Sequence, residues 1–489
     1  MRKSLLLYYF LSYFAENQTQ DMKNYILPFL ITLTVLAISC SQKIYPDRSQ
    51  FVKDGEEVPT LQLERYKSVQ LRPRQDSSLG VALAISGGGS RAANLGVGIM
   101  LGLEDFENRP YKNLLKEVDY LSTVSGGGFA AGAYLNALFT HQSLRRESPF
   151  SLEEHLAINI RESLAYSYTG ALLRANFNPL LWFTPVDDGD GLERAIDNQV
   201  LGYRYRRKND SLPERSILLK DCFIPRTSDQ PVRFPMHIAN SSTLNTMTIF
   251  PFTPGILDRY RITGYTHRLR KHEDKNLDPY EVPLSVGIKA SGSFPVLISN
   301  STLSSAYSKE RPYLHLIDGA MTDNIGYYTA LEALKQDEAS RKVLLIIDAD
   351  AVGNRYTFSK KEGALFSLGV AARLPSSGLD ARRATLRRDV MEACRPYNIQ
   401  QVFFSFNVLL EDNNAPLPEV IDLKAEQDRL LRLLRAQQPL ADADKQILYE
   451  LLTHIGTKYT IEEEEQELLL LGGQLIVQLR RPDLLEALR

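Results

Sequence analysis

The chain has 489 residues, of which 44% are hydrophobic and 24% are charged, with a formal net charge of −2. This composition is that of a globular protein, long enough for one large domain with appendages or for two domains. The near-neutral charge argues against nucleic-acid binding, which normally needs a clustered basic face. The three cysteines, Cys40, Cys222 and Cys394, are too few and too scattered for a disulfide framework or a zinc site.

The stretch MKNYILPFLITLTVLAISC (residues 22–40) predicts a secretory signal. A basic residue follows Met22, and the apolar run after it is shorter than the roughly 20 residues that span a bilayer. We therefore interpret residues 1–40 as a signal region in which translation starts at Met22. Cys40 follows L-A-I-S and resembles the acylated cysteine of a bacterial lipoprotein. This resemblance predicts a membrane anchor on the extracytoplasmic side of a bacterial envelope, at the outer membrane or the periplasmic face. The alternative is a buried cysteine that ends a plain signal peptide.

Residues 41–79 are polar and contain several prolines, which indicates a tether. Beyond them, short continuous runs of Val, Ile, Leu and Phe are typical of strands buried on both faces of a parallel sheet. Residues 140–215 lack regular alternation and are interpreted as an insertion or cap. The pattern predicts one main α/β domain. The predicted strands are 81–86, 118–124, 313–318, 342–350 and 401–406.

The C-terminal region has a helical pattern from about residue 417 onward. Thr460 and Glu463 match the T-x-x-E capping box that begins a helix. The following sequence QELLLLGG ends in two glycines, which are expected to stop that helix.

The stretch ISGGGSR (residues 85–91) places three glycines between a predicted strand and a predicted helix. Unobstructed backbone N–H groups at a helix N-terminus suit an anion or a developing oxyanion. Gly87, Gly89 and Ala92 also satisfy the loose dinucleotide fingerprint G-x-G-x-x-A. A third possibility is a connection that lets strand and helix pack closely, and the stretch alone leaves all three open.

Ser125 lies in VDYLSTVSGGGFAAGAYL (residues 118–135), between a predicted strand and a helix of small residues. A serine at such a turn, with small neighbours, describes a nucleophile elbow, in which a tight turn exposes the hydroxyl. The usual pattern is G-x-S-x-G; here Thr123 replaces the first glycine, and the three glycines after the serine compensate for it. The alternative is a serine that caps a buried helix.

A serine hydroxyl needs a base to take its proton. None of the seven histidines has a late strand–loop setting typical of a hydrolase triad, and His315, inside the apolar run YLHLID, is expected to pack in the core. Asp318 ends that run just before Gly319, where a carboxylate can project into a site at the carboxyl edge of the sheet. The alternative for Asp318 is an Asx-turn.

Taken in order, G-G-G-x-R, the serine elbow and a later D-G-A resemble the patatin-like phospholipases, with SGGGSRA and DGAMTDNIG closer to their cytosolic phospholipase branch. GIKASGSFPVLIS (287–299) resembles the family's A-S-x-x-x-P segment, and YTIEEEEQELLLLGG resembles its terminal helix. The resemblance covers residues 80–475 and leaves 476–489 as a C-terminal tail. Departures from the family pattern are Ala92, Thr123, Ala320 and Gly326.

The resemblance implies a three-layer α/β/α fold with a mainly parallel central sheet, and a catalytic Ser–Asp dyad. In this dyad Ser125 attacks an ester carbonyl and Asp318 acts as general base. The oxyanion is held by backbone N–H groups of Gly87, Gly88 and Gly89.

Arg91 is either a ligand for a lipid phosphate or a structural arginine. The resemblance requires no cofactor and no metal. The acidic stretch 187–191 lacks the glutamate that closes a calcium loop, and is interpreted as a turn.

We weigh three function classes. The first and favoured one is a lipid acyl hydrolase, anchored beside its membrane-lipid substrate, which raises the effective concentration of that substrate. The second is a nucleotide-dependent enzyme, which predicts an acidic ribose ligand about 20 residues after the glycines; Glu104 and Asp105 come too early, and Asp119 opens a strand instead of closing one. The third is a non-catalytic patatin-fold lipoprotein that acts as a binding or scaffold module.

Overall fold

The computed structural model of the chain divides into two units, Met1–Lys53 and Asp54–Arg489, and every residue that it describes belongs to the second. The signal region with Cys40, the tether up to residue 75 and most of the insertion at 140–215 lie outside the described residues. None of the described helices combines the length and hydrophobicity needed to cross a bilayer. Apart from six isolated positions, the structure describes residues 76–107, 113–143, 188–202, 216–223, 234–295, 298–307, 312–350, 385–411, 421–457 and 461–489.

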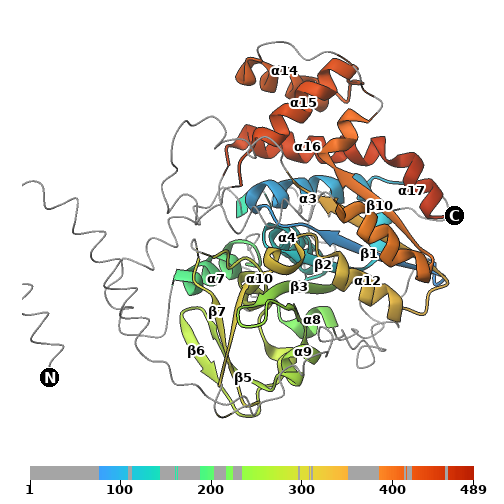
Figure 1. Cartoon of the computed structure of the whole chain (residues 1–489). Coiled ribbons are helices and arrows are strands. Elements are labelled where there is room, and N and C mark those ends of the chain that lie inside the picture. The colour runs from blue at the N-terminus through green and yellow to red at the C-terminus, as the bar shows by residue number, and fades with distance from the viewer. Residues whose placement is uncertain are drawn as a thin grey trace, which may run out of the picture. The chain divides into compact units, whose positions relative to one another are not determined.

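The described strands form one ten-stranded mixed sheet in the order β10-β9-β1-β2-β3-β8-β7-β5-β6, with β4 paired to β3 (Figure 1). The strands are β1 (Leu79–Ile85), β2 (Val118–Val124), β3 (Met236–Thr243), β4 (Ile249–Phe252), β5 (Ile262–His267), β6 (Arg270–Glu273), β7 (Ser301–Ser305), β8 (Tyr313–Asp318), β9 (Arg341–Asp348) and β10 (Ile399–Ser405).

The sheet has a parallel half and an antiparallel half. Strands β10, β9, β1, β2 and β3 are parallel, and four of the five strands predicted from apolar runs belong to this half. The fifth, β8, was expected to be parallel but pairs antiparallel with both β3 and β7. The connection from β7 to β8 is too short for the crossover that parallel neighbours need, so the chain must reverse direction.

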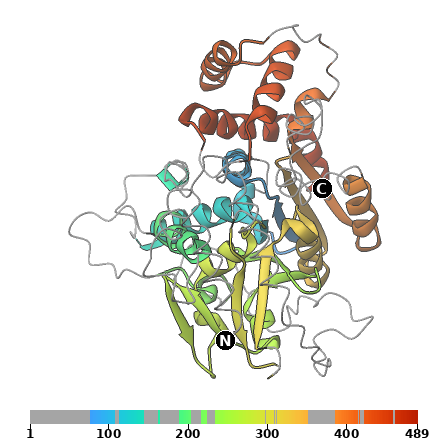
Figure 2. The ribbon, with the colours of Figure 1, turned by 60° about the vertical axis from the view of Figure 1, so that its left-hand side comes forward.

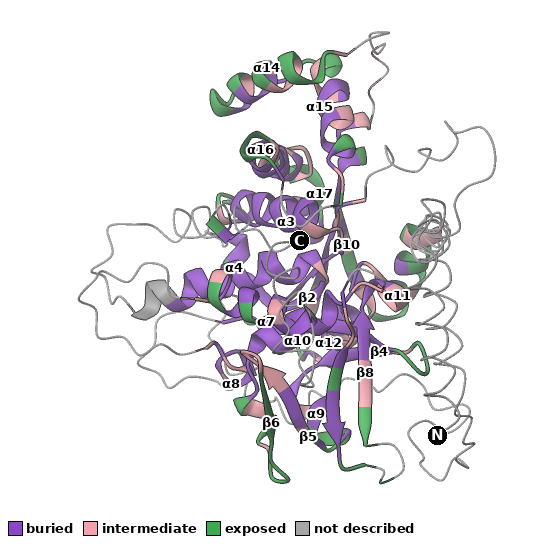
Figure 3. Cartoon of the chain, turned by 90° about the vertical axis from the view of Figure 1, so that its left-hand side faces the viewer, coloured by how far each residue is buried: buried purple, intermediate pink, exposed green. Residues whose placement is uncertain are grey.

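Helices cover both faces of the parallel half, which confirms the predicted α/β class. Helices α3 (Gly89–Glu104) and α4 (Gly126–Ser143) follow β1 and β2, whereas α12 (Tyr327–Gln336) precedes β9. The connections through α3 and α4 advance along the sheet in one direction and the connection through α12 in the other. Right-handed crossovers between the parallel strands β1, β2 and β3 place α3 and α4 on one face of the sheet, and α12 packs against β1, β2 and β9 on the opposite face (Figure 3).

Smaller helices pack around the antiparallel half, and four further helices form the C-terminal region at the other end of the sheet (Figure 2). The smaller ones are α7 (Asp188–Gln199), α8 (Leu219–Phe223), α9 (Pro254–Arg259), α10 (Leu284–Ser291) and α11 (Ala320–Asp323). The C-terminal helices are α14 (Leu423–Arg435), α15 (Asp442–His454), α16 (Glu463–Leu479) and α17 (Arg481–Ala487).

The start of α16 differs from the prediction. Its capping box joins Glu462 and Glu465, and Thr460 lies outside the described residues. Residues 476–489, expected as a tail, complete α16 and form α17, where Leu484 is fully buried.

The two glycines expected to stop α16, Gly472 and Gly473, lie inside it, and Gly473 serves a close helix crossing. A Cβ on Gly473 would come within 2.8 Å of the backbone of Gly98 in α3. In turn, a Cβ on Gly98 would come within 2.4 Å of the carbonyl oxygen of Leu470. Glycines on both helices therefore let the backbones of α3 and α16 touch.

Candidate active site

Ser125 occupies a strained turn between β2 and α4, as the elbow pattern predicts. Its φ angle is 49°, a left-handed conformation that non-glycine residues rarely adopt and that occurs mainly where surrounding structure enforces it. The glycines after it are needed for space. A Cβ on Gly126 would lie 2.2 Å from the carbonyl oxygen of Gly89, and one on Gly127 would lie 2.5 Å from that of Ile85.

Thr123 does not prevent this turn, because it lies inside β2, before the turn begins. Its buried side chain makes a hydrogen bond within the sheet. Its hydroxyl hydrogen-bonds the Nε2 atom of His237 on β3 at 2.8 Å. Burial lowers the pKa of His237 to about 3, so the imidazole is neutral at physiological pH. Sequence reasoning did not single out His237, because strand β3 is mostly polar and lacks the apolar run that marked its neighbours.

Asp318 ends β8 with its carboxyl group buried. Its Oδ1 accepts a hydrogen bond from the Ala320 N–H at 2.8 Å, which is the Asx-turn considered as an alternative role. Burial raises the pKa of Asp318 to about 7, while hydrogen bonds from Ala320 and from the Ser125 hydroxyl oppose the rise. The contact with Ser125 falls short of full hydrogen-bond geometry, and Oδ2 has no other partner among the described residues. One oxygen is thus held by the turn, and the other makes no hydrogen bond within the described residues.

The end of α10 and the loop that follows it hold the serine and the aspartate together. Ser291 Oγ accepts a hydrogen bond from the Ser125 N–H at 2.9 Å. The carbonyl oxygen of Ser291 accepts one from the Gly319 N–H at 3.2 Å, and that of Ser293 accepts one from the Asp318 N–H at 2.9 Å. Sequence reasoning included this loop in the family resemblance but assigned it no contact.

The glycine loop offers fewer oxyanion donors than expected. The Gly87 N–H donates to the carbonyl oxygen of Asn324 at 2.9 Å, so it is already used. Gly88 and Gly89 have φ angles of 141° and 59°, and their N–H groups have no backbone acceptor in the described part of the chain. Because α3 begins at Gly89, these two groups lie at the positive end of the helix dipole.

Arg91 is buried and binds backbone carbonyl groups. Its Nε donates to Ala349 at 2.9 Å and its Nη1 donates to Ile455 at 2.7 Å. These bonds tie the start of α3 to the end of β9 and to the C-terminal helices. They favour the structural role over the phosphate-binding role.

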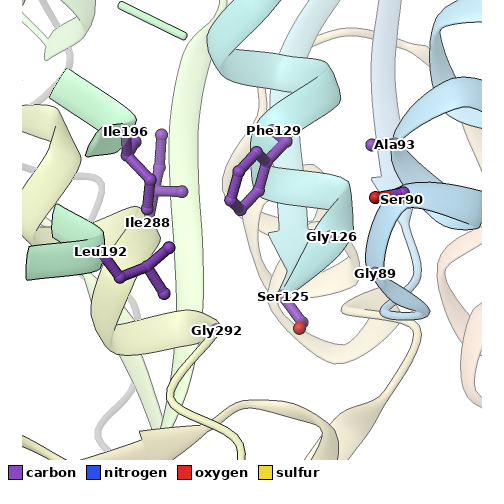
Figure 4. A pocket seen from close by; sticks show the side chains of 10 residues that line it. All are labelled: Gly89, Ser90, Ala93, Ser125, Gly126, Phe129, Leu192, Ile196, Ile288 and Gly292. Atoms are coloured by element: carbon purple, nitrogen blue, oxygen red, sulfur yellow. The ribbon is translucent and has the colours of Figure 1, made fainter. Parts of the chain in front are cut away.

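A narrow pocket leads away from Ser125 and is lined by residues of α3, α4, α7 and α10 (Figure 4). Apolar side chains make up most of its wall, and the Ser90 hydroxyl, buried without a partner among the described residues, is a polar exception. In Figure 4, Leu192, Ile196 and Ile288 face Phe129 across the pocket. The lining residues are Gly89, Ser90, Ala93, Ser125, Gly126, Phe129, Leu192, Ile196, Ile288 and Gly292.

The helix α7 that supplies Leu192 begins within the stretch 187–191, which was expected to be a turn. Residues 188–191 form the first turn of this helix instead. A Cβ on Gly189 would lie 2.5 Å from Cε of Lys289, so glycine makes room for the lysine of the neighbouring helix α10.

Glu193, Asp197 and His267 form a group of side chains that can ligate a metal ion, within the described residues. Nε2 of His267 lies 3.5 Å from Glu193 Oε1 and 3.4 Å from Asp197 Oδ2. Arg268 already binds both carboxylates. Its side-chain Nε donates to Asp197 at 2.6 Å, and its backbone N–H donates to Glu193 at 2.8 Å. The contacts are those of an ion-pair cluster.

His315 is not a packed core residue, contrary to expectation. It is only partly buried near the outer end of β8, where Tyr313 is half exposed. Its Nδ1 hydrogen-bonds Asn300 and Thr302, each at 3.0 Å.

Comparisons with solved structures find chains of low sequence identity. Human GIVD cytosolic phospholipase A2 matches with 13% identity and a TM-score of 0.39, over 86% of this chain and 62% of that one. Its complex with methyl gamma-linolenyl fluorophosphonate and terbium chloride matches with 15% identity and a TM-score of 0.38, over 86% and 61%. VipD from Legionella pneumophila matches with 12% identity and a TM-score of 0.24, over 83% and 85%.

This chain thus spans less than two thirds of the length of the human structures. No curated protein matches it significantly. The family described as patatin-like phospholipase matches residues 83–331, which is more than half of the chain and includes the glycine loop, the serine elbow and Asp318. The chain belongs to the patatin-like phospholipase family.

Proposed function

We propose that this protein is a serine-dependent lipid acyl hydrolase that cleaves carboxylic esters of membrane lipids. One observation carries the proposal: Ser125, strained and partly exposed, opens into an apolar pocket beside the buried carboxyl group of Asp318. A base with a pKa near the working pH is best suited to accept and return a proton. The pKa of Asp318, about 7, meets this condition.

In the first half of the reaction, Asp318 Oδ2 takes the proton of the Ser125 hydroxyl while Oγ attacks the ester carbonyl carbon. The N–H groups of Gly88 and Gly89 stabilise the oxyanion of the tetrahedral intermediate, a contribution of about 3 kcal/mol for one good donor. The intermediate collapses to an acyl-enzyme on Ser125. The leaving alcohol takes the proton back from Asp318.

In the second half, Asp318 removes a proton from a water molecule that attacks the acyl-enzyme. The fatty acid is then released, and Asp318 returns the proton to the Ser125 oxygen. The apolar wall of the pocket suits the acyl chain of such an ester, because burying the chain there removes apolar surface from water.

The proposal is tested by labelling with a fluorophosphonate probe, which reacts with activated serines. We expect one labelled peptide, containing Ser125, and no labelling in Ser125→Ala, which keeps a small residue at the turn. Ser122 is an internal control, because its hydroxyl is buried and donates to the carbonyl oxygen of Gly326 at 2.6 Å. Absence of labelling in the folded wild type contradicts the proposal and favours a binding or scaffold module.

We also propose that the protein is a lipoprotein, acylated at Cys40 and anchored on the extracytoplasmic side of a bacterial envelope. The sequence around Cys40 supports this proposal. Globomycin or Cys40→Ser should leave an unprocessed precursor. Mass spectrometry of the mature N-terminus contradicts the proposal if Cys40 is unmodified or absent.

A further inference from the structure

Helix α7 uses two adjacent faces for two different purposes. Leu192 and Ile196 are one helical turn apart, and both line the pocket that leads from Ser125. Glu193 and Asp197 are also one turn apart, and both point to the turn between β5 and β6. The helix therefore forms a wall of the pocket and is held in place from the adjacent side.

The attachment at the C-terminal part of α7 is buried and charged. Asp197 bonds the guanidinium of Arg268, and Glu193 accepts hydrogen bonds from the Arg268 N–H and from the Ser285 hydroxyl at 2.6 Å. Burial raises the pKa of Asp197, but hydrogen bonds and charges of His267 and Arg268 outweigh it and hold the pKa below its ordinary value. Asp197 is thus an anion that depends on these two partners.

A second attachment lies at the N-terminal part of α7. Lys289 of α10 is almost fully buried, and its Nζ lies 3.9 Å from Asp190. The neighbouring residue on α10, Ile288, lines the pocket opposite Phe129. Charged contacts therefore fix α7 at both ends while its apolar side chains limit the pocket between them.

We infer that α7 determines which acyl chains the enzyme accepts, with Leu192 and Ile196 as the residues that limit chain length and Arg268 as the residue that positions them. This inference rests on the proposed function, because it assigns the pocket to the acyl chain of the ester cleaved at Ser125. The pocket is narrow, and both side chains are almost completely buried at its wall. A longer chain must displace them or stop short of them.

The first experiment changes the wall. Leu192→Ala and Ile196→Ala each remove methyl and methylene groups from the pocket and leave room for additional carbons of the chain. A single methylene in an apolar pocket changes kcat/KM by about tenfold or more. We therefore expect the ratio of kcat/KM for dodecanoyl over butanoyl p-nitrophenyl ester to rise at least about tenfold in each variant.

The matched control is Arg194→Ala, which changes an exposed residue of the same helix and should leave the ratio unchanged. An unchanged ratio in both Leu192→Ala and Ile196→Ala, with active enzyme, overturns the inference but not the proposed function. Wild-type protein that hydrolyses none of the esters overturns the proposed function itself, so the two failures are distinguishable.

The second experiment changes the attachment. Arg268→Ala removes the guanidinium that bonds Asp197 and should loosen α7, so the dodecanoyl-to-butanoyl ratio should rise several-fold, less than in the wall variants. Arg268→Lys should restore part of the wild-type ratio because it keeps a cation there. The control is Lys271→Ala on the same hairpin, where the lysine pairs with exposed Glu273. Equal losses for both esters in Arg268→Ala contradict the positioning role, since a merely structural defect does not select chain length.

Discussion

The two halves of the sheet contribute to the site in different ways. The parallel half brings the glycine loop and Ser125 to the carboxyl ends of the neighbouring strands β1 and β2, the usual location of sites in such sheets. It holds them through close backbone contacts, as between Gly126 and Gly89. The antiparallel half supplies Asp318 at the end of β8 and, through the β5–β6 turn, the attachment of α7, and it works through side-chain bonds and burial.

In the proposed reaction, the geometry of the attacking oxygen and of the oxyanion is therefore fixed by the backbone, whereas proton transfer and chain selection depend on side chains. Substitutions in the two halves should therefore fail in different ways. Changes in the antiparallel half should alter a protonation state or a substrate preference. Changes in the parallel half should displace backbone groups and lower the rate for every substrate.

The largest expected effect is that of Asp318→Asn, which removes the proposed base while keeping the shape of the side chain. General-base catalysis contributes about 10²–10⁴ in rate, so kcat should fall by that factor with the fold retained. Steady-state hydrolysis of a soluble ester measures the rate, and circular dichroism checks the fold. An Asn variant with near wild-type kcat means that another group accepts the serine proton.

The next effect comes from the parallel half. Gly126→Ala should lower kcat by about 10²–10³, because the new Cβ pushes away the backbone of Gly89 and with it an oxyanion donor. The control is Gly128→Ala, where the nearest atom is the flexible Ile288 side chain at 3.2 Å. Equal rates in the two variants show that the contact with Gly89 does not hold the donor in place.

The pH dependence should report the burial of Asp318. With a pKa of about 7, the carboxyl group is protonated and inactive in acid, so kcat/KM should fall about tenfold per pH unit below 7 and reach a plateau above it. A pH series with a soluble ester gives the midpoint. A midpoint near 4 shows that the carboxylate is solvated in the free enzyme.

The same shift affects stability, with a fixed sign. The folded-state pKa of about 7 lies above the ordinary value of 3.8, so the folded protein holds this proton more tightly than the unfolded chain does. The stabilisation from that proton is complete below pH 3.8 and is lost as the pH rises through 7. As the pH rises from 4 to 8, wild type should lose this stabilisation and Asp318→Asn should not, so the variant should become more stable relative to wild type. Denaturant unfolding at the two pH values measures the change. If the free energies of unfolding of wild type and Asp318→Asn differ by the same amount at both pH values, the pKa of Asp318 is not raised.

Sequence reasoning predicted the parallel half well, because strands such as β1 and β2 are continuous apolar runs, and such runs are typical of strands buried on both faces. It missed β3, where polar residues such as Asn240 and Ser241 are buried and tertiary hydrogen bonds replace apolar burial. The glycine loop was predicted to be a donor site, yet no local pattern shows that the Gly87 N–H donates to the carbonyl oxygen of Asn324, a residue far away in the sequence. Contacts across such distances depend on the assembled fold.

The smallest expected effect is that of a metal chelator, which should change nothing. No step of the proposed reaction needs a cation, since Asp318 takes the serine proton and backbone N–H groups hold the oxyanion. Glu193, Asp197 and His267 are the metal-ligand group found among the described residues, and there Arg268 supplies the positive charge that a cation would otherwise bring. We expect hydrolysis of a soluble ester by the purified protein to be the same with and without excess EDTA. Activity that is lost in EDTA and restored by calcium or zinc contradicts this expectation. If His267→Ala also abolishes the metal-restored activity, the ion binds at this cluster, beside α7.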